Sequence, residues 1–375
     1  MPDKDSAESA TTIWINARFL DRPITGVERV AREIIGILAR EHLDAQGCWS
    51  HGARRFRFRL LAPASSAATS PWPNLPLQRT GLFSGHAWEQ LDLPRLTRGD
   101  WLLSLCNTGP LLKRRHLIFL HDAQPFAIPQ NFSLPFRLWY RVLFTIASRC
   151  ARRVLVNSRF TMTELHKYLG IKPGKMVLCY PGSEHARRGR PDMKVLHRHE
   201  LPHERFVLAV SSTNPNKNFG AVVKALEMLG DAAPPCIIVG GSGQKHFAAV
   251  KLDPARVTHL GYVSDAELLA LYGRALCLVF PSFYEGFGLP PLEAMANGCP
   301  VIVSGTSSMP EVAGPVAEYC DPAHPDSLAR AIGKVATSPA RRAEMILGGL
   351  TRARRFSWAR CTRELLQVIA CTAGA

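Results

Sequence analysis

Short apolar runs alternate along this chain with longer segments in which apolar residues recur every three or four positions. The short runs are typical of buried β-strands, and the longer segments of amphipathic helices. Strands that alternate with helices in this way predict an α/β fold built on doubly wound parallel sheets. The runs that predict strands include Thr12–Asn16, Phe58–Ala62, Trp101–Leu105, His116–His121, Val154–Asn157, Met176–Tyr180, Phe206–Val210 and Ala275–Phe280.

The alternation occurs twice, which predicts two domains. A chain of 375 residues is also longer than one hydrophobic core usually supports. Residues 183–203 interrupt the pattern, because they are rich in Arg and Pro and have little apolar periodicity. We therefore predict a first domain at 1–185, a linker at 186–203, a second domain at 204–355 and a helical C-terminal segment at 356–375.

The segment between residues 280 and 296 predicts a ligand-binding turn between a strand and a helix. The strand Ala275–Phe280 precedes it, and Pro290 and Pro291 suit the first positions of a helix. Gly286 and Gly288 allow the backbone to turn sharply and to approach a ligand closely. The N–H groups of the new helix would then face an anion such as phosphate.

Two carboxylates flank this turn. Glu285 is expected at the end of the strand, and Glu293 in the first turn of the helix. A carboxylate accepts two hydrogen bonds at once, so each could hold the vicinal hydroxyls of a sugar or a ribose. An acid in a first helical turn also has a simpler interpretation, since it complements the helix dipole.

The whole segment P-S-F-Y-E-G-F-G-L-P-P-L-E-A-M-A, with Glu285 and Glu293 in it, resembles the signature of retaining glycosyltransferases of family four. Residues 298–303 and 309–314 continue the resemblance. The phrase A-R-F-L-D-R-P-I-T-G-V-E-R-V-A-R-E near the N-terminus is similar to the opening of bacterial members, mannosyltransferases among them. The resemblance implies the GT-B fold, in which two Rossmann-like domains face each other across a cleft. It also implies an acceptor-side first domain and a final helix that crosses back to it.

The same resemblance implies which residues bind the nucleotide-sugar donor. Glu285 would hold the sugar hydroxyls, and Glu293 the ribose. Lys217, a compact cation after a strand, suits a phosphate, but Asn216 stands where family members commonly have an arginine. The complete expected donor set, in which residues 262–263 contact the base and most of the others the diphosphate, is Gly26, Lys217, Tyr262, Val263, Gly286, Phe287, Gly288, Leu289 and Glu293, with Glu285 as a catalytic residue.

His121 is the second catalytic candidate. It is expected at the carboxyl end of a strand, where open α/β sheets bind their ligands. An imidazole there could hydrogen-bond the donor sugar or help an acceptor hydroxyl to lose its proton. The alternative is a polar residue that caps the next segment together with Asp122.

The formal net charge is +16, from 46 basic and 30 acidic side chains. No nucleic-acid-binding motif accompanies it, so a phosphorylated substrate and an anionic membrane surface are the better explanations. The segment Leu134–Arg153 mixes aromatic and basic residues and could lie on such a surface, although a core-facing helix is the commoner meaning of this pattern. Residues 1–5 lack the features of a signal peptide. We expect a cytoplasmic protein, with peripheral contact at the inner face of the cytoplasmic membrane left open.

The expected function is the retaining transfer of a hexose, with mannose from GDP-mannose as the best guess, to a glycan or polyprenyl-linked acceptor in bacterial polysaccharide biosynthesis. No cofactor and no metal are expected, because the only Asp-x-Asp triplet, at residues 3–5, lies in a polar tail. Three alternatives remain open. They are a sugar-nucleotide epimerase of the same fold, a phosphorylase that uses pyridoxal phosphate, and a basic non-catalytic protein that binds nucleic acid or membrane.

Overall fold

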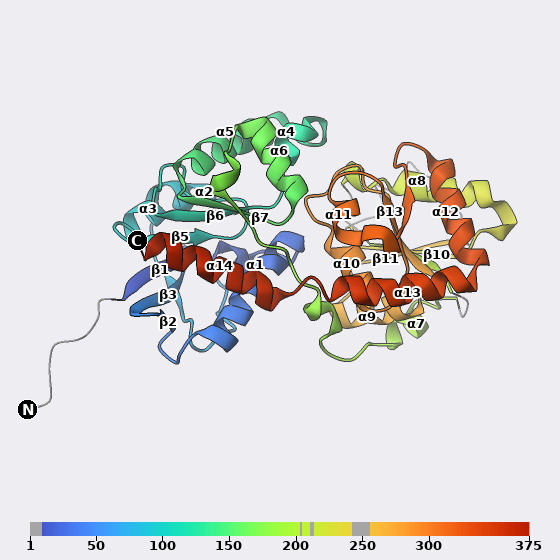
Figure 1. Cartoon of the computed structure of the whole chain (residues 1–375), viewed down its shortest axis with the longest axis horizontal. Helices are drawn as coiled ribbons and strands as arrows, with labels where there is room; N and C mark the ends of the chain where they lie inside the picture. The colour runs from blue at the N-terminus through green and yellow to red at the C-terminus, as the bar shows by residue number, and fades with distance from the viewer. Residues whose placement is uncertain (1–9, 203–204, 211–213, 242–255, 375) are drawn as a thin grey trace, which may run out of the picture. The chain divides into compact units, whose positions relative to one another are not determined.

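The computed structural model describes residues 10–202, 205–210, 214–241 and 256–374 (Figure 1). The chain divides into two compact units. The first comprises Met1–Pro181 with Trp358–Ala375, and the second comprises Gly182–Ser357. The expected Asp-x-Asp triplet at residues 3–5 lies outside the described residues.

The first unit is built on an eight-stranded sheet. Its strand order is β2-β3-β1-β5-β6-β7-β8, with β4 paired to β3. All pairs are parallel except the β2–β3 hairpin. The strands are β1 (Thr11–Asn16), β2 (Cys48–His51), β3 (Arg54–Ala62), β4 (Leu77–Arg79), β5 (Trp101–Ser104), β6 (His116–Leu120), β7 (Arg153–Val156) and β8 (Met176–Leu178).

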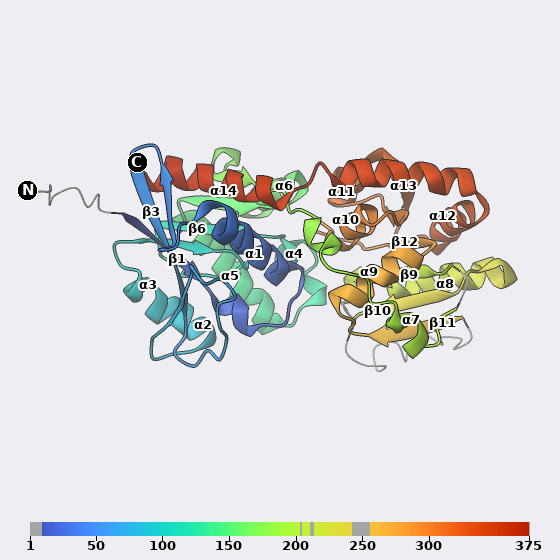
Figure 2. The ribbon, with the colours of Figure 1, turned by 90° about the horizontal axis from the view of Figure 1, so that it is seen from below.

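Helices pack on this sheet because their apolar faces match its buried strands. The longest, α5, buries Leu143, Phe144 and Ala147 in a core shared with β6, β7 and α6. The C-terminal helix α14 belongs to this unit and lies beside α1 (Figure 2), where the Thr362 hydroxyl donates to the carbonyl of Ile34 at 3.5 Å. The helices are α1 (Gly26–Ile37), α2 (Gly85–Ala87), α3 (Leu93–Leu96), α4 (Gln124–Ala127), α5 (Leu134–Cys150), α6 (Arg159–Leu169) and α14 (Trp358–Ala373).

The second unit has a six-stranded, fully parallel sheet in the order β11-β10-β9-β12-β13-β14. This is the strand order of dinucleotide-binding folds. Its strands are β9 (Val207–Val210), β10 (Cys236–Val239), β11 (Val257–Gly261), β12 (Cys277–Phe280), β13 (Val301–Ser304) and β14 (Glu318–Cys320). Its helices are α7 (Lys194–Arg198), α8 (Phe219–Leu229), α9 (Asp265–Arg274), α10 (Leu289–Ala296), α11 (Met309–Ala313), α12 (Pro325–Thr337) and α13 (Pro339–Ala353).

Two parts of the first unit were not predicted. The strand β3 begins at Arg54, four residues before the predicted start, and forms a hairpin with β2. Its alternation of arginine with Phe56 and Phe58 is a half-buried strand pattern that a search for continuous apolar runs does not find. The helical segment from Gly85 to Leu96 was also missed, because its apolar residues are few and Pro94 interrupts them.

The residues predicted as a linker, 186–203, fall inside the second unit, which begins at Gly182. They include the short helix α7, which packs against α9. Val195 of α7 is fully buried, and the Asp192 N–H donates to the carbonyl of Ala266 at 2.9 Å. Two buried side chains, Val195 and Leu201, and an ion pair between Arg198 and Glu267 also anchor this segment, although its sequence has little apolar periodicity.

Within the part of the chain that the structure describes, no helix combines the length and the apolar content that a membrane crossing requires.

Candidate functional site

The second unit brings the main sequence-predicted residues together at the carboxyl ends of β9 and β12. These strands are neighbours in the sheet, but the chain leaves them in opposite directions, toward β10 and toward β13. Ligands of open α/β sheets bind at such a switch point. Lys217 follows β9 at the end of a short 3-10 turn (Pro215–Lys217), and Glu285 lies in the loop between β12 and α10.

Lys217 and Glu285 form an ion pair, with 2.6 Å between Nζ and Oε1. The side chains are only 20% and 9% exposed. The Lys217 ammonium also lies 5.1 Å from the centre of the Phe280 ring. An ammonium has three donors, so Lys217 can hold the Glu285 carboxylate and still donate to a phosphate. Likewise, the carboxylate has further lone pairs for sugar hydroxyls.

The loop before α10 is held from behind by Ser308. Its hydroxyl donates at 2.9 Å both to the carbonyl of Glu285 and to that of Phe287. In a trans peptide unit the N–H points away from the C=O. The N–H groups of Gly286 and Gly288, which share peptide units with those two carbonyls, therefore point away from Ser308. This is the direction in which a bound anion would meet them.

Gly288 is the N-cap of α10, with φ +95° and ψ +67°. A Cβ atom at this position would lie 2.3 Å from the Cε atom of Met309. Glycine is therefore favoured by the backbone conformation, and the end of the Met309 side chain would have to move to admit a Cβ. Pro290 and Pro291 occupy the second and third positions of the helix, where a missing N–H costs nothing.

Gly288→Ala should lower the melting temperature and weaken nucleotide binding, because alanine is strained at this left-handed φ and the Met309 side chain must move to admit the Cβ. A loss of about 1–3 kcal/mol of stability is expected, measured by thermal unfolding with and without nucleotide. Gly298→Ala is the matched control. Its φ is also left-handed, at +70°, but the nearest atom to its added Cβ is 3.6 Å away. Equal losses in the two variants would contradict the steric argument.

Glu293 is the fifth residue of α10, so the expectation that it lies in the first helical turn was wrong. The helix begins at Leu289, immediately after the glycine, and no acidic side chain lies in its first turn. The Glu293 carboxylate contacts His185 Nε2 at 2.8 Å and accepts from the Tyr272 hydroxyl at 3.0 Å. Burial and the nearby Glu293 carboxylate raise the pKa of Tyr272 well above its usual value. Glu293 is thus oriented by two protein partners, and its role toward a ribose stays a proposal.

Tyr262 and Val263 follow β11, one strand beyond β10 in the same sheet. The Tyr262 side chain is 80% exposed, whereas Val263 is buried. The backbone before them is anchored, since the Gly240 N–H donates to the carbonyl of Gly261 at 2.7 Å. An exposed aromatic ring at the carboxyl edge of the sheet is suited to stack on a base.

Gly26 lies in the first unit, where it is the first residue of α1. Thr25 caps this helix, and its N–H and hydroxyl both donate to the buried Glu28 carboxylate. The predicted loop at a helix N-terminus is therefore present. The structure also contains the simpler feature expected there, an N-cap threonine.

His121 follows β6 directly and is 4% exposed. Its Nε2 lies 2.7 Å from the carbonyl oxygen of Leu105, which can only accept a hydrogen bond, so Nε2 carries the proton. The ring stacks on Phe119 at 4.4 Å. Burial lowers the pKa of His121 to about 4. At neutral pH the imidazole is therefore uncharged, and Nδ1 is the nitrogen that can accept a hydrogen bond.

A second buried histidine, His116, makes the first unit sensitive to acid together with His121. Burial lowers the pKa of His116 to about 3 from the ordinary 6.5. Below about pH 6.5 the unfolded chain binds protons that the folded unit does not bind. Stability is therefore complete above pH 6.5 and falls as the pH drops toward 4, by about 1.4 kcal/mol per pH unit for each histidine.

The urea midpoint of unfolding should accordingly fall between pH 7.5 and pH 5. The variant His116→Gln keeps a partner for the Ser104 hydroxyl, which lies 2.9 Å from His116 Nε2. Because one of the two titrating histidines is then absent, the pH-dependent loss of stability that the two histidines cause should be about half as large. An identical fall in wild type and variant would show that His116 does not titrate on unfolding as described.

Sequence reasoning missed the residues that orient the site, namely His185, Tyr272 and Ser308. Ser308 precedes the resemblance segment at 309–314, and a hydroxyl just before a helix could have been considered. His185 and Tyr272 lie 108 and 21 positions from Glu293, and nothing in their local sequence indicates this contact.

A profile of glycosyl transferases group 1 matches residues 196–350, which include the ion pair and the turn before α10. The match spans less than half of the chain. The predicted resemblance is thus confirmed. The strand order of the second unit is that of a Rossmann-like sheet.

Two curated proteins that are similar to this chain are named as bacterial mannosyltransferases. The chain is 30% identical over 227 residues to O-antigen chain mannosyltransferase B of Escherichia coli, which covers 58% of this chain and 60% of the relative. It is 30% identical over 238 residues to O-antigen chain mannosyltransferase RfbU of Salmonella typhimurium, with coverage of 62% and 64%. The chain therefore matches less than two thirds of the length of these relatives.

A solved structure that is similar to this chain is that of sucrose-phosphate synthase from Thermosynechococcus elongatus. The TM-score is 0.74 at 19% identity, over 97% of this chain and 100% of that chain. A likeness at this identity shows the fold. The prediction of a GT-B fold with two Rossmann-like units is thereby confirmed.

Proposed function

We propose that this protein is a retaining glycosyltransferase that transfers a hexose from a nucleotide sugar to a glycan or a polyprenyl-linked oligosaccharide in bacterial polysaccharide biosynthesis. The observation that carries the proposal is the Lys217–Glu285 ion pair at the switch point of the second sheet, beside the glycine turn before α10. It places a cation for a diphosphate, beside the N-terminus of α10, next to a carboxylate for sugar hydroxyls.

In the proposed reaction, the bond between sugar C1 and the diphosphate oxygen breaks, and a bond forms between C1 and the acceptor oxygen. The acceptor attacks from the face that the diphosphate leaves, which retains the anomeric configuration. The acceptor proton goes to a diphosphate oxygen. Lys217 and the Gly288 N–H stabilise the negative charge that builds on the leaving group, and such fixed donors are most effective when they are in place before the reaction.

The first unit supplies the acceptor side of the proposal. His121 can accept a hydrogen bond at Nδ1, but a pKa of about 4 makes it a weak base at neutral pH. We therefore propose that it positions a hydroxyl rather than removing its proton. Gly26 at the start of α1 is proposed to contact the donor diphosphate.

Mannose from GDP-mannose is the proposed donor, because both curated relatives described above are named mannosyltransferases. No cofactor or metal ion takes part in this proposal. Contact with the inner face of the cytoplasmic membrane is part of it, since the acceptor class includes lipid-linked glycans.

The test is a transfer assay with GDP-mannose, UDP-glucose and UDP-galactose, each with a polyprenyl-diphosphate-linked oligosaccharide acceptor, in the presence and absence of EDTA. We expect transfer from GDP-mannose that EDTA does not reduce, and an α-linked product by NMR from the α-linked donor. Release of an epimerised free sugar without transfer would support an epimerase. A β-linked product, or a strict need for Mg²⁺ or Mn²⁺, would contradict the proposed mechanism.

A further inference from the structure

The first unit carries a concentrated positive charge at the amino edge of its sheet. The segments before β5, β6, β7 and β8 meet at this edge because the four strands are parallel neighbours. Among the residues within four positions of these strand starts, Asp100 is the acidic one. We call the following nine side chains the basic edge: Arg98, Lys113, Arg114, Arg115, Arg149, Arg152, Arg153, Lys172 and Lys175.

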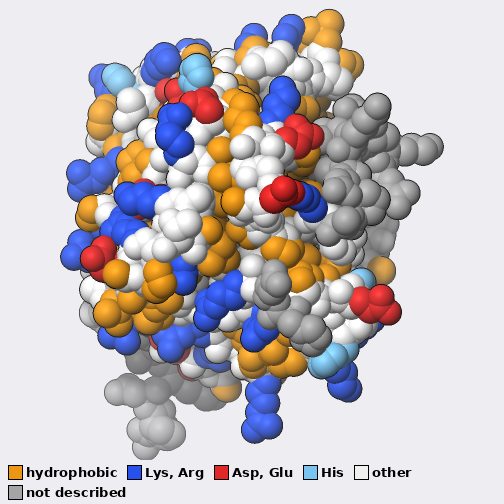
Figure 3. All heavy atoms as spheres, turned by 90° about the vertical axis from the view of Figure 1, so that its right-hand side faces the viewer, with side chains coloured by type: hydrophobic (Ala, Val, Ile, Leu, Met, Phe, Trp, Pro, Cys, Tyr) orange, Lys and Arg blue, Asp and Glu red, His pale blue; other side chains and the backbone are white. Residues whose placement is uncertain are grey.

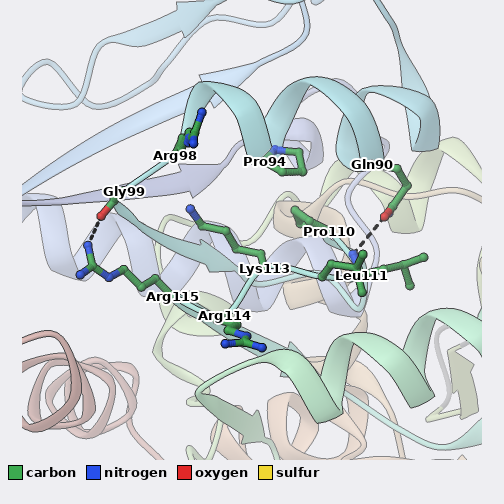
Figure 4. Close-up of a pocket in the computed structure, with 10 residues that line it drawn as sticks. Gln90, Pro94, Arg98, Gly99, Pro110, Leu111, Lys113, Arg114 and Arg115 are labelled. Carbon is green, nitrogen blue, oxygen red and sulfur yellow. Dashed lines mark hydrogen bonds between the residues drawn. The ribbon is translucent and has the colours of Figure 1, made fainter.

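Two adjoining hollows lie along the basic edge. The first, of about 610 Å³, has Gln90, Pro94 and Arg98 on one side and Lys113 to Arg115 on the other (Figure 4). The second, of about 750 Å³, is lined by residues 149–153 and by Lys172, Gly174 and Lys175. Arg114 lines both hollows, so they adjoin at this residue.

The floor of the first hollow is rigid. The Gln90 side chain holds the loop before β6 through two hydrogen bonds, from its Nε2 to the carbonyl of Gly109 at 3.0 Å and from the Leu111 N–H to its Oε1 at 2.9 Å. Gly109 itself packs tightly against His116 and Ser104, where a Cβ would lie 2.8 Å from each side chain.

The charges of the basic edge are not neutralised by carboxylates. Lys113 and Arg115 donate to the carbonyls of Thr97 and Gly99, and Lys175 donates to that of Arg149. Bonds to carbonyl oxygens fix a cation but leave its charge in place. Burial lowers the pKa of Lys113 and of Lys175, although Asp100 opposes this effect for Lys113. The exposed members of the edge form no ion pair with any residue that the structure describes; they are Arg98, Arg114, Arg115, Arg149, Arg152 and Lys172.

Basic residues elsewhere are commonly paired. In the second unit, Arg341 bonds Glu318 at 2.6 Å, and Arg330 bonds Asp326 at 2.6 Å. Over the face shown in Figure 3, red acidic side chains lie among the blue basic ones. The basic edge therefore differs from an ordinary solvated surface by its lack of balancing acids.

Apolar side chains are exposed within the same surface. Leu112, which lines the first hollow between Leu111 and Lys113, is 78% exposed. Pro94, Pro110 and Leu111 line the first hollow beside the cations. A surface that presents both cations and exposed leucine suits the interface of an anionic bilayer, where lipid phosphates meet the cations and acyl chains receive the leucine. A naked polyanion would leave Leu112 in water.

We propose that the basic edge binds the phosphate groups of an anionic lipid bilayer, with Arg98 and Arg114 at the mouth of the first hollow and Leu112 inserted among the acyl chains. The choice of a bilayer rests on the proposed function, whose acceptor class includes lipid-linked glycans. This surface is distinct from the aromatic and basic segment Leu134–Arg153 considered from the sequence, which contributes only its C-terminal end. Binding through the amino edge leaves the opposite, carboxyl edge with His121 uncovered.

The test is co-sedimentation of the full chain with vesicles of phosphatidylcholine containing 30% phosphatidylglycerol, against pure phosphatidylcholine. Wild type should bind only the anionic vesicles. Arg114→Glu/Arg152→Glu should bind them about 30-fold or more weakly, since each basic residue near such a surface contributes roughly 1 kcal/mol. The control Lys224→Glu/Arg354→Glu makes the same change in net charge on exposed side chains of the second unit and should bind nearly as wild type does.

A second pair of variants distinguishes a bilayer from any polyanion. Leu112→Ser should weaken vesicle binding several-fold and leave heparin binding unchanged, whereas Leu347→Ser, 69% exposed in α13, should change neither. An equal loss in the two charge variants, or an unaltered affinity of Leu112→Ser for vesicles, would overturn the inference. Transfer to a water-soluble acceptor by the Arg114/Arg152 variant is measured separately. If wild type does not bind the anionic vesicles but transfers sugar, only this inference is contradicted. If it binds the vesicles but transfers no sugar, only the proposed function is contradicted.

Discussion

Replacing Glu285 with glutamine should lower the rate of sugar transfer by about 10²–10³-fold, in line with the loss of one fixed polar group in a reaction site. Glutamine has nearly the same shape, and its oxygen can still accept from Lys217. The variant should therefore stay folded, with a melting temperature close to that of wild type. What it loses is the negative charge and one acceptor that the proposal assigns to the sugar hydroxyls.

The measurement is the initial rate of transfer at saturating donor, together with the melting temperature. Glu344→Gln is the matched control, because this glutamate is an exposed residue of α13 that pairs with Arg341 at the surface. It should transfer at the parental rate. If Glu285→Gln also transfers at that rate while it remains folded, Glu285 does not hold the reacting sugar.

Lys217→Met should reduce both transfer and stability. The methionine removes the cation proposed to meet the diphosphate, which we expect to cost about 10²–10³-fold in rate. It also leaves the Glu285 carboxylate without its partner, although its side chain is only 9% exposed. Removing one member of such a pair costs about 3 kcal/mol of folding stability, and a chemical unfolding curve would measure this loss.

The double variant Lys217→Met/Glu285→Gln separates the two effects. Both charges are then absent, so most of the lost stability should return, while transfer stays low. The non-additivity of the two substitutions in a double-mutant cycle measures their coupling. A double variant as unstable as Lys217→Met alone would show that the ion pair is not the source of the instability.

The turn before α10 could be predicted because the residue types that form it also determine its backbone conformation. Gly288 has a left-handed backbone, and Pro290 and Pro291 fix the start of the helix. These constraints act over a few neighbouring residues, so the turn can be recognised from the local sequence. The alternation of apolar strands and helices predicted the two sheets for the same reason.

The position and the partners of Glu293 could not be predicted from the local sequence. Its place in the second turn of α10 follows from a helix that begins one residue before the prolines, at Leu289. Its partners His185 and Tyr272 come from a 3-10 turn and from α9. Contacts between elements that are distant in the sequence depend on the packing of the whole unit, and no local pattern records them.

The chemical state of His121 also depended on the fold. The sequence indicated a histidine at a strand end, but burial lowers its pKa, and the contact with the Leu105 carbonyl only partly opposes this effect. The basic edge is a similar case. Its nine members are dispersed over four segments of the chain, and only the parallel order of β5 to β8 brings them to one edge of the sheet.

The most direct measurement of the central claim is a crystal structure of the protein with bound GDP. The account predicts diphosphate oxygens within about 3 Å of Lys217 Nζ and of the Gly288 N–H, with the base near Tyr262. A nucleotide that binds elsewhere, or one whose phosphates contact neither Lys217 nor the turn before α10, would contradict it.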